Sequence, residues 1–275
     1  MRPARFHFGR LHVVGQFTDK AEFLFRGLRT NVLLKHRDHL WGFFAVAPLS
    51  EYPDVFAGYL VKLAPEQAEE VGDLETHELA SVTVPNAAVA KARFFLDVPH
   101  GLIAFQHVSS HVPVETFTSR FCEVLEEGLD RFFVNADIQL IEARFEFLEA
   151  LGRLSRIDRL EVVLHPTNPR NDEWYRRTDE RLKRLEIDKY KEVMEAARSG
   201  PGLNVTDDAE IRGKVVMAED GYGEVAAHGM LEGKHTRIST KQNPVSTAIH
   251  LGELSLDSVY KGLKGAIDDI KRRFN

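Results

Sequence analysis

The sequence has little cysteine, no long apolar run and no excess of positive charge. Its one cysteine, Cys122, cannot form an internal disulfide and is typical of a protein kept in a reducing compartment. The longest nearly uninterrupted apolar run, residues 41–49, is far shorter than the ~20 residues that a membrane-spanning helix needs. The N-terminal residues carry positive charge without a following apolar core, which is unlike a signal peptide. We therefore expect a cytoplasmic protein that does not enter a membrane.

The overall composition is that of a folded protein. Apolar residues make up 43% of the 275 residues and charged residues 28%, which excludes a disordered chain, a collagen and a disulfide scaffold. A chain of this length forms one large domain or two small ones. Such a chain buries enough surface on folding to be stable without disulfides or structural metal ions.

Charge is distributed unevenly along the chain, although the net charge is −6. Residues 1–37 carry eight Lys and Arg against two Asp and Glu, and residues 234–275 carry eight against four. Residues 51–78 carry one Lys against eight acids. Such segregation can place a basic surface on an acidic protein, and it is equally compatible with two basic ends that never meet in space.

Alternating apolar and polar residues predict several strands in the first third of the chain. Asp19 is placed to cap a short helix that carries Phe23, Leu24 and Leu28. The acidic stretch that ends at Glu78 indicates a loop or a short helix. The predicted strands cover residues 5–14, 32–34, 40–46, 56–63 and 79–84.

The middle of the chain predicts an α+β unit. Residues 92–96 and 102–105 flank turn residues 98–101, which indicates a β-hairpin. A helix follows Pro113, where apolar residues recur at helical spacing. A strand, a short helix and a second strand are then expected over residues 134–141, 145–154 and 160–164. The order β-β-α-β-α-β favours one mixed or antiparallel sheet over residues 92–165, with helices on one face.

The last hundred residues predict a long charged helix followed by a smaller part. The helix is expected over residues 172–198, and the Gly-Pro-rich residues 199–202 are the best candidate boundary. We therefore expect two domains, 1–198 and 203–275, the first an α+β globular domain that ends in the long charged helix.

The predicted domain 203–275 is a helix–hairpin–helix unit. Asp207 and Glu210 form a capping box, and residues 221–240 form a hairpin. The final helix carries an apolar stripe that we expect to be buried against this hairpin or a second subunit. The stripe consists of Leu256, Val259, Tyr260, Leu263, Ile267, Ile270 and Phe274.

No catalytic motif stands out. The histidine pairs 36/39 and 107/111 have ligand spacing, but a zinc site needs two further ligands, so we predict no metal and no cofactor. Asp220 followed by Glu232-Gly233-Lys234 matches the acid and Glu-x-Lys pattern with which nucleases hold Mg²⁺. The same Glu-Gly-Lys also fits a hairpin tip, which cannot preorganise a metal. Phosphate-binding glycine loops and nucleophile elbows are absent from the sequence, which favours a binding protein over an enzyme.

Two basic segments are candidates for contact with nucleic-acid phosphates, and Trp174 could stack on a base. Acids interspersed in the first segment, such as Glu173 and Asp179, are equally typical of a solvated, salt-bridged helix. We predict that the two segments form one surface. Its residues are Arg176, Arg177, Arg181 and Arg184 in the long helix and Lys271, Arg272 and Arg273 near the C-terminus.

Two passages resemble an uncharacterised bacterial family found in mobile and phage-defence contexts. One is residues 157–169, IDRLEVVLHPTNP, and the other is residues 218–225, AEDGYGEV, which continues to residues 238–244, ISTKQNP. The order of elements from Phe94 onward is distantly similar to the family of the phage-exclusion protein RexA, a dimeric, non-specific DNA binder. The resemblance implies an α+β globular part joined to a smaller piece, and it carries over no catalytic residue.

These observations lead to one expected function and two alternatives. We expect a phage-defence protein of the abortive-infection type that binds nucleic acid non-specifically, DNA in preference to RNA, as a homodimer. The first alternative is a metal-dependent nuclease that uses Asp220 and Glu232. The second is a non-enzymatic sensor or scaffold that binds a phage or defence-system protein. Phosphate binding weakens steeply with salt, whereas a nuclease depends on divalent cations.

Overall fold

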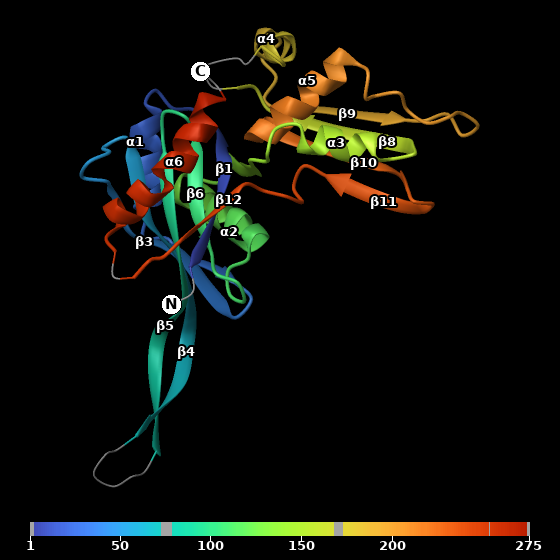
Figure 1. The fold of residues 1–275 in the computed structure, drawn as a ribbon. Helices are drawn as coiled ribbons and strands as arrows, with labels where there is room; N and C mark the ends of the chain where they lie inside the picture. Colours follow the sequence, from blue (N-terminus) through green and yellow to red (C-terminus); the bar gives the residue numbers. More distant parts are fainter. Residues whose placement is uncertain (1–2, 73–78, 168–172, 253, 274–275) are drawn as a thin grey trace.

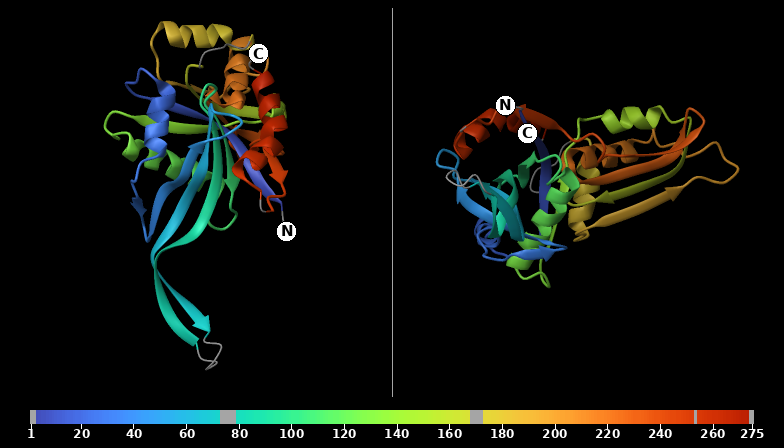
Figure 2. Two further views of the ribbon diagram at one scale, coloured as in Figure 1. Left: turned by 90° about the vertical axis from the view of Figure 1, so that its left-hand side faces the viewer. Right: turned by 90° about the horizontal axis from the view of Figure 1, so that it is seen from below.

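The computed structural model describes residues 3–72, 79–167, 173–252 and 254–273, which form two antiparallel sheets and their helices (Figures 1 and 2). The predicted α+β class is confirmed. The elements in chain order are β1 (Ala4–Val14), α1 (Lys20–Leu28), β2 (Leu34–His36), β3 (His39–Pro48), β4 (Val55–Gly72), β5 (Leu79–Asp97), β6 (Leu102–His107), α2 (Val114–Gly128), β7 (Asn135–Leu140), α3 (Glu146–Gly152), β8 (Arg156–Leu164), α4 (Arg176–Arg184), β9 (Tyr190–Glu195), α5 (Ala209–Met217), the π-type turn η1 (Ala218–Tyr222), β10 (Gly223–Leu231), β11 (Lys234–Ser239), β12 (Ser246–Ile249) and α6 (Leu256–Arg272).

The first sheet has the strand order β12-β1-β6-β5-β4-β3-β2, with β7 also paired to β1. Its strands follow a curved path when seen from below (Figure 2). Apolar side chains of α1 and α2 pack on one face of this sheet. On the opposite face, Phe6 and Phe8 of β1 and Phe95 of β5 pack against α6. Because side chains alternate along a strand, neighbouring residues of β1 contribute to both cores.

The hairpin predicted around residues 98–101 is confirmed. β5 and β6 pair in register from Phe94 with Phe105 to Asp97 with Leu102. Gly101 has a φ of 62°, a left-handed conformation that favours glycine. This turn lies at one end of the first sheet, and its position matters for the site described below.

The acidic segment is a strand over residues 64–72, where the expectation of a loop or short helix is wrong, and its last residues, 73–78, lie outside the described residues. β4 continues to Gly72 and pairs with β5 over its whole length. Beyond Leu63 this pair has no further strand beside it, because β3 pairs with β4 only up to that residue. The result is a two-stranded arm that projects from the body (Figures 1 and 2). Cross-strand pairing with β5 decided this outcome, and the local acidic composition did not reveal it.

The second sheet has the order β11-β10-β8-β9. The expectation of a single sheet over residues 92–165 is therefore wrong, because β8 pairs with β10 and β9 rather than with the first sheet. Helices α3 and α5 cover one face, where Leu160 and Val162 of β8 meet Val215 and Val216 of α5. The expected arrangement, in which helices cover one face of a sheet, is found in this second sheet.

The long charged helix predicted over residues 172–198 is also wrong. α4 spans only nine residues, and Glu186 follows its end with a left-handed φ of 54°. Residues 190–195 form strand β9, which pairs with the free edge of β8. Glu192 faces the covered side of the sheet because Lys214 of α5 forms an ion pair with it at 2.7 Å. Period-two and helical spacing both fit this short segment, and the available strand edge selects the strand.

The apolar stripe of the last helix is buried as predicted, but its packing partner differs. Five of its residues are at most 3% exposed: Val259, Tyr260, Leu263, Ile267 and Ile270. They pack against the first sheet and not against the hairpin of residues 221–240. Phe274 lies outside the described residues. The chain thus leaves the first sheet after β7, forms the second sheet, and returns through β12 and α6. The candidate boundary at residues 199–202 lies between β9 and α5, both of which belong to the second sheet and its helical cover.

Candidate functional site

The turn η1 lies where the two sheets meet, and all five of its residues are buried. α5 leads into this turn and β10 leads out of it. Gly221 adopts a φ of 82°, and a Cβ there would lie 2.9 Å from Cγ1 of Ile141 and 3.1 Å from Cβ of Arg10. Glycine is therefore required both by the backbone conformation and by the close approach of β1. Turns of this π type are frequent at functional sites.

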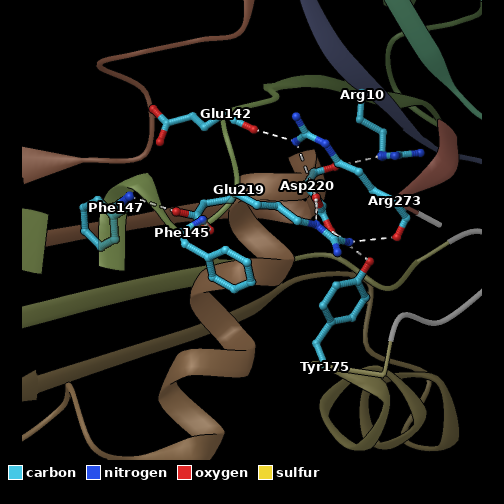
Figure 3. A network of polar contacts seen from close by, with 9 residues as sticks. Arg10, Glu142, Phe145, Phe147, Tyr175, Glu219, Asp220 and Arg273 are labelled. Atoms are coloured by element: carbon cyan, nitrogen blue, oxygen red, sulfur yellow. Dashed lines mark hydrogen bonds and ion pairs between the residues drawn. The ribbon is translucent and has the colours of Figure 1, made fainter. Parts of the chain in front are cut away.

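The carboxylate of Asp220 in this turn is the centre of a buried ion cluster (Figure 3). Arg144 donates to it with Nη2 at 2.6 Å and with Nε at 3.1 Å. Nη1 of Arg273 lies 3.7 Å away, and the Tyr175 hydroxyl donates at 3.4 Å. Burial raises the pKa of Asp220, and the hydrogen bond and charge of Arg144 oppose that rise. The cluster joins the start of α4, the end of α6 and the segment before α3.

The neighbouring Glu219 holds the first turn of α3. Its two carboxylate oxygens accept hydrogen bonds from the backbone N–H groups of Phe145 at 2.9 Å and Phe147 at 2.8 Å. These N–H groups have no partner within the helix, so a carboxylate from a distant turn satisfies them. Burial raises the pKa of Glu219 to about 7, and that of the nearby Glu142 to about 8.

A pocket of about 320 Å³ opens beside η1, at the end of β1. β6 begins at Leu102, which pairs with Arg10, so the residues of β1 after Arg10 extend beyond the start of β6. Arg10 and His12 point to the same side of β1 because they are two residues apart. The polar and aromatic residues lining the pocket are Arg10, His12, Phe17, Lys20, His100, His165, Asp188 and Tyr222.

Two cations converge in this pocket. Arg10 is 3% exposed, donates to the backbone carbonyls of His100 at 2.7 Å and Asp220 at 3.2 Å, and lies 4.1 Å above the ring of Tyr222. The half-buried Lys20 forms no ion pair or hydrogen bond with any residue that the structure describes. Burial lowers the pKa of Lys20, and the charge of Arg10 lowers it further. The pocket therefore has a positive potential that favours an anion.

Two stacked imidazoles form another part of the pocket wall. The rings of His12 and His165 lie 4.9 Å apart between centroids. Nε2 of His12 donates to the carbonyl of Gly221 at 2.8 Å, and Nδ1 of His165 donates to that of Asp188 at 3.0 Å. These carbonyls can only accept, which assigns the tautomers. Burial lowers the pKa of His12 to about 3 and also lowers that of His165, so both rings are neutral at pH 7.

The four arginines predicted in the charged helix are all exposed on α4. None of them forms an ion pair with another residue in the described part of the chain. Asp179 is fully buried instead, where it accepts hydrogen bonds from N and Oγ1 of Thr167 at 2.7 and 2.6 Å and pairs with Lys183 at 2.7 Å. Asp179, one of the acids on which the alternative of a solvated, salt-bridged helix depended, therefore points into the protein. The four residues are Arg176, Arg177, Arg181 and Arg184.

The three C-terminal cations predicted to share that surface are engaged elsewhere. Lys271 pairs with the buried Asp97, and Arg272 pairs with Asp269 on its own helix. Arg273 pairs with Asp220 and donates to the backbone carbonyl of Glu142 at 2.6 Å. The end of α6 and the start of α4 do meet at Asp220, where Arg273 makes an internal contact, while Lys271 makes its internal contact with Asp97.

Trp174 lies just before α4 and is 47% exposed. The ring of Phe145 meets it edge-on at 5.3 Å, and the guanidinium of Arg212 lies 5.7 Å from its ring. Part of the indole surface is thus already occupied by side chains of this protein.

The residues of the nuclease alternative are far apart. Asp220 is buried in its ion cluster, whereas Glu232 lies at the exposed tip of the β10–β11 hairpin with a φ of 50°. The nine residues of β10 separate them, which corresponds to roughly 25 Å of strand. Within residues 3–72, 79–167, 173–252 and 254–273, no three His, Cys, Asp or Glu side chains are grouped in a way that could hold a metal ion.

Reasoning from the sequence missed the pocket, although two signals pointed to it. Residues 157–169 and 218–225, the passages that carry the family resemblance, meet here through His165 and Tyr222. The alternation of β1 also placed Arg10 and His12 on one side of the strand. Their proximity to Lys20 depends on the packing of α1 and could not be read from spacing.

The comparisons with known proteins give one finding. No curated protein matches this sequence. In the part of the chain that the structure describes, no helix is long and apolar enough to cross a membrane. A family model described as a domain of unknown function, DUF4747, matches residues 38–264. This match covers most of the chain, including the whole second sheet and the first sheet from β3 onward, and the protein therefore belongs to the DUF4747 family.

Proposed function

We propose that the protein binds nucleic acid without sequence preference through the basic face of α4, formed by Arg177, Arg181 and Arg184 with Arg176 beside them. The observation that supports this most directly is the burial of Asp179, which leaves the arginines exposed and without acidic partners in the described chain. Exposed arginines of this kind neutralise phosphates and release counterions. Contacts to phosphate position a protein on nucleic acid but carry no sequence information.

The spacing of the arginines supports a continuous contact. Arg177, Arg181 and Arg184 are at positions i, i+4 and i+7, which places them within one narrow sector of the helix. At 1.5 Å per residue they span about 10 Å along the helix axis. Asp179 and the buried Leu182 lie on the opposite side, toward the protein. A face of this length can contact two or three neighbouring phosphates of one strand.

The test is the salt dependence of binding. Arg177→Gln, Arg181→Gln and Arg184→Gln are combined in one variant, and binding to a labelled DNA duplex is followed by fluorescence anisotropy over a series of salt concentrations. Each lost phosphate contact lowers the slope of log K against log salt by about 0.9 on duplex DNA. The slope should therefore fall by up to about 2.7, equally for unrelated sequences.

A matched control removes the same charge elsewhere. Arg153, Arg198 and Arg237 are exposed and lie outside α4, and their combined replacement by Gln should leave the slope near that of the wild type. Equal effects of the two triple variants would show that net charge and not the α4 face matters. Absence of binding by the wild type at low salt would favour a protein partner instead.

Three further parts of this proposal rest on the family resemblance. Preference for DNA is tested by competition with RNA of the same sequence. The homodimer is tested by the mass of the protein in solution. The phage-defence role is tested by plaque counts on cells that carry the wild type or the α4 triple variant, with protection expected only from the wild type.

A further inference from the structure

The pocket at the end of β1 combines a cationic corner with an apolar rim. Lys20 and Arg10 form the cationic corner, next to the turn of residues 98–101. A Cβ on Gly101 would lie 3.8 Å from Nζ of Lys20, and the carbonyl of His100 already accepts from Arg10. Asp188 also lines the pocket, and its backbone carbonyl holds His165. The two hydrogen bonds of Arg10 given above end on backbone carbonyl oxygens.

The rim of the pocket carries an aromatic side chain that is unusually exposed to solvent. Phe17 lines the pocket, is 37% exposed and is held by stacking on Phe23 at 5.0 Å between centroids. Phe132 and Phe133, in the turn before β7, are 88% and 77% exposed. The backbone of Phe133 approaches the segment that leads to Phe17, because a Cβ on Gly15 would lie 3.5 Å from the carbonyl oxygen of Phe133. Exposed aromatic rings beside a cationic site are typical of proteins that stack nucleobases.

We propose that this pocket binds a nucleotide, with its phosphate between Arg10 and Lys20 and its base against Phe17. The charge of the corner selects a phosphate, and the ring of Phe17 selects an aromatic group at its other end. The volume of about 320 Å³ lies at the small end of the range of roughly 300–1,000 Å³ for small-molecule sites. A single nucleotide is therefore the appropriate size of ligand.

The histidines fix the shape of the site. His12 and His165 are neutral at pH 7 and are both held by backbone carbonyls. They form a rigid wall that adds no charge, so Arg10 and Lys20 provide the attraction for the phosphate. Tyr222 supports Arg10 from below through its ring face.

The nucleotide can be a free molecule or the terminal residue of a strand. In the second case this inference deepens the nucleic-acid binding proposed above, and in the first it stands without it. AMP and a 5′-phosphorylated oligonucleotide, measured side by side, distinguish the two sources. Equal affinities indicate a free nucleotide, whereas tighter binding of the phosphorylated strand than of its 5′-hydroxyl form indicates a strand end.

The experiment is titration of the full chain with AMP, adenosine and inorganic phosphate by calorimetry. AMP should bind, inorganic phosphate should compete with it, and adenosine should bind at least tenfold more weakly. Lys20→Met should weaken AMP binding roughly tenfold or more without lowering the melting temperature, because Lys20 has no ion pair or hydrogen bond with the described residues. Phe17→Ala should weaken binding of AMP but not of inorganic phosphate.

The controls separate this site from the α4 face. Lys35→Met removes the same charge from the exposed edge strand β2 and should leave AMP binding unchanged. The triple Gln variant of α4 should also bind AMP normally, so failure of the proposed nucleic-acid binding leaves this result intact. Absence of AMP binding at millimolar concentration overturns the inference, as does a Lys20→Met variant that binds AMP as tightly as the wild type.

Discussion

Replacement of Asp220 by Asn tests whether the ion cluster at η1 holds the two sheets together. Asp220 is fully buried and interacts with Arg144 and Arg273, whose side chains are each 20% exposed. The variant removes the negative charge that these two mostly buried guanidinium groups share. Removing one member of a buried ion pair costs about 3–5 kcal/mol, because the remaining charge stays desolvated. We expect Asp220→Asn to lower the free energy of unfolding by that amount.

A second pair in the same protein provides the control. Nε of Arg156 lies 2.6 Å from Oδ1 of Asp158, the same distance as the closest contact between Arg144 and Asp220. The side chains of this pair are 34% and 33% exposed, so solvent screens them and Asp158→Asn should cost at most about 1 kcal/mol. Burial is the main difference between the two pairs, and it accounts for the expected difference in stability.

The assay is urea denaturation of the wild type and both variants, followed by circular dichroism and tryptophan fluorescence. For a chain of this size the larger loss corresponds to a drop of roughly 10 °C in Tm. Equal losses for the two variants would refute the reasoning, since burial of the cluster would then contribute nothing. A loss confined to the fluorescence of Trp174 would show that the cluster holds only the start of α4.

Three other predictions follow from burial. Leu263→Ala removes a fully buried side chain between α6 and the first sheet and should cost about 2–5 kcal/mol in urea denaturation, against an unchanged value for the exposed Lys261→Ala. Because the folded pKa values of Glu219 and Glu142, about 7 and 8, exceed the ordinary 4.5, their contribution to stability is present below pH 4.5 and is lost as pH rises to 8. Glu219→Gln should therefore reduce the loss of Tm between pH 4.5 and 7 relative to the wild type. The buried histidines, whose pKa values are lowered, contribute equally to the pH dependence of both proteins, so they do not affect this comparison. Burial raises the pKa of the Cys122 thiol, so iodoacetamide should leave the native protein unlabelled at pH 8 and label it once in urea; rapid native labelling would contradict its burial.

Local sequence signals were sufficient wherever neighbouring residues determine the conformation. Asp19 caps α1 by accepting from the N–H groups of Ala21 and Glu22, as its position before an apolar helix predicts. The turn at residues 98–101 and the stripe of α6 were also readable, because turn chemistry and helical spacing act within a few residues. The class of fold follows from such elements alone.

Tertiary contacts decided the segments in which two patterns compete. Residues 190–195 fit a helix and a strand, and the free edge of β8 together with the ion pair from Lys214 made them a strand. Residues 64–72 have an acidic composition that suggests a loop, yet pairing with β5 extends β4 through them. In both cases the deciding partner is distant in the sequence, and a local pattern contains no information about it.

The candidate sites divide in the same way. The arginines of α4 could be identified from the sequence because exposure on a charged helix needs only a local pattern, although the inward turn of Asp179 could not. The pocket and the ion cluster combine β1, α1, η1 and the ends of α4 and α6, which lie up to about 260 residues apart in the chain. Chain folding brings their side chains within hydrogen-bonding distance, and burial then changes their pKa values. The sequence by itself therefore determined the elements and their charges, whereas only the tertiary structure decided which charges meet, because proximity and desolvation are properties of the folded chain.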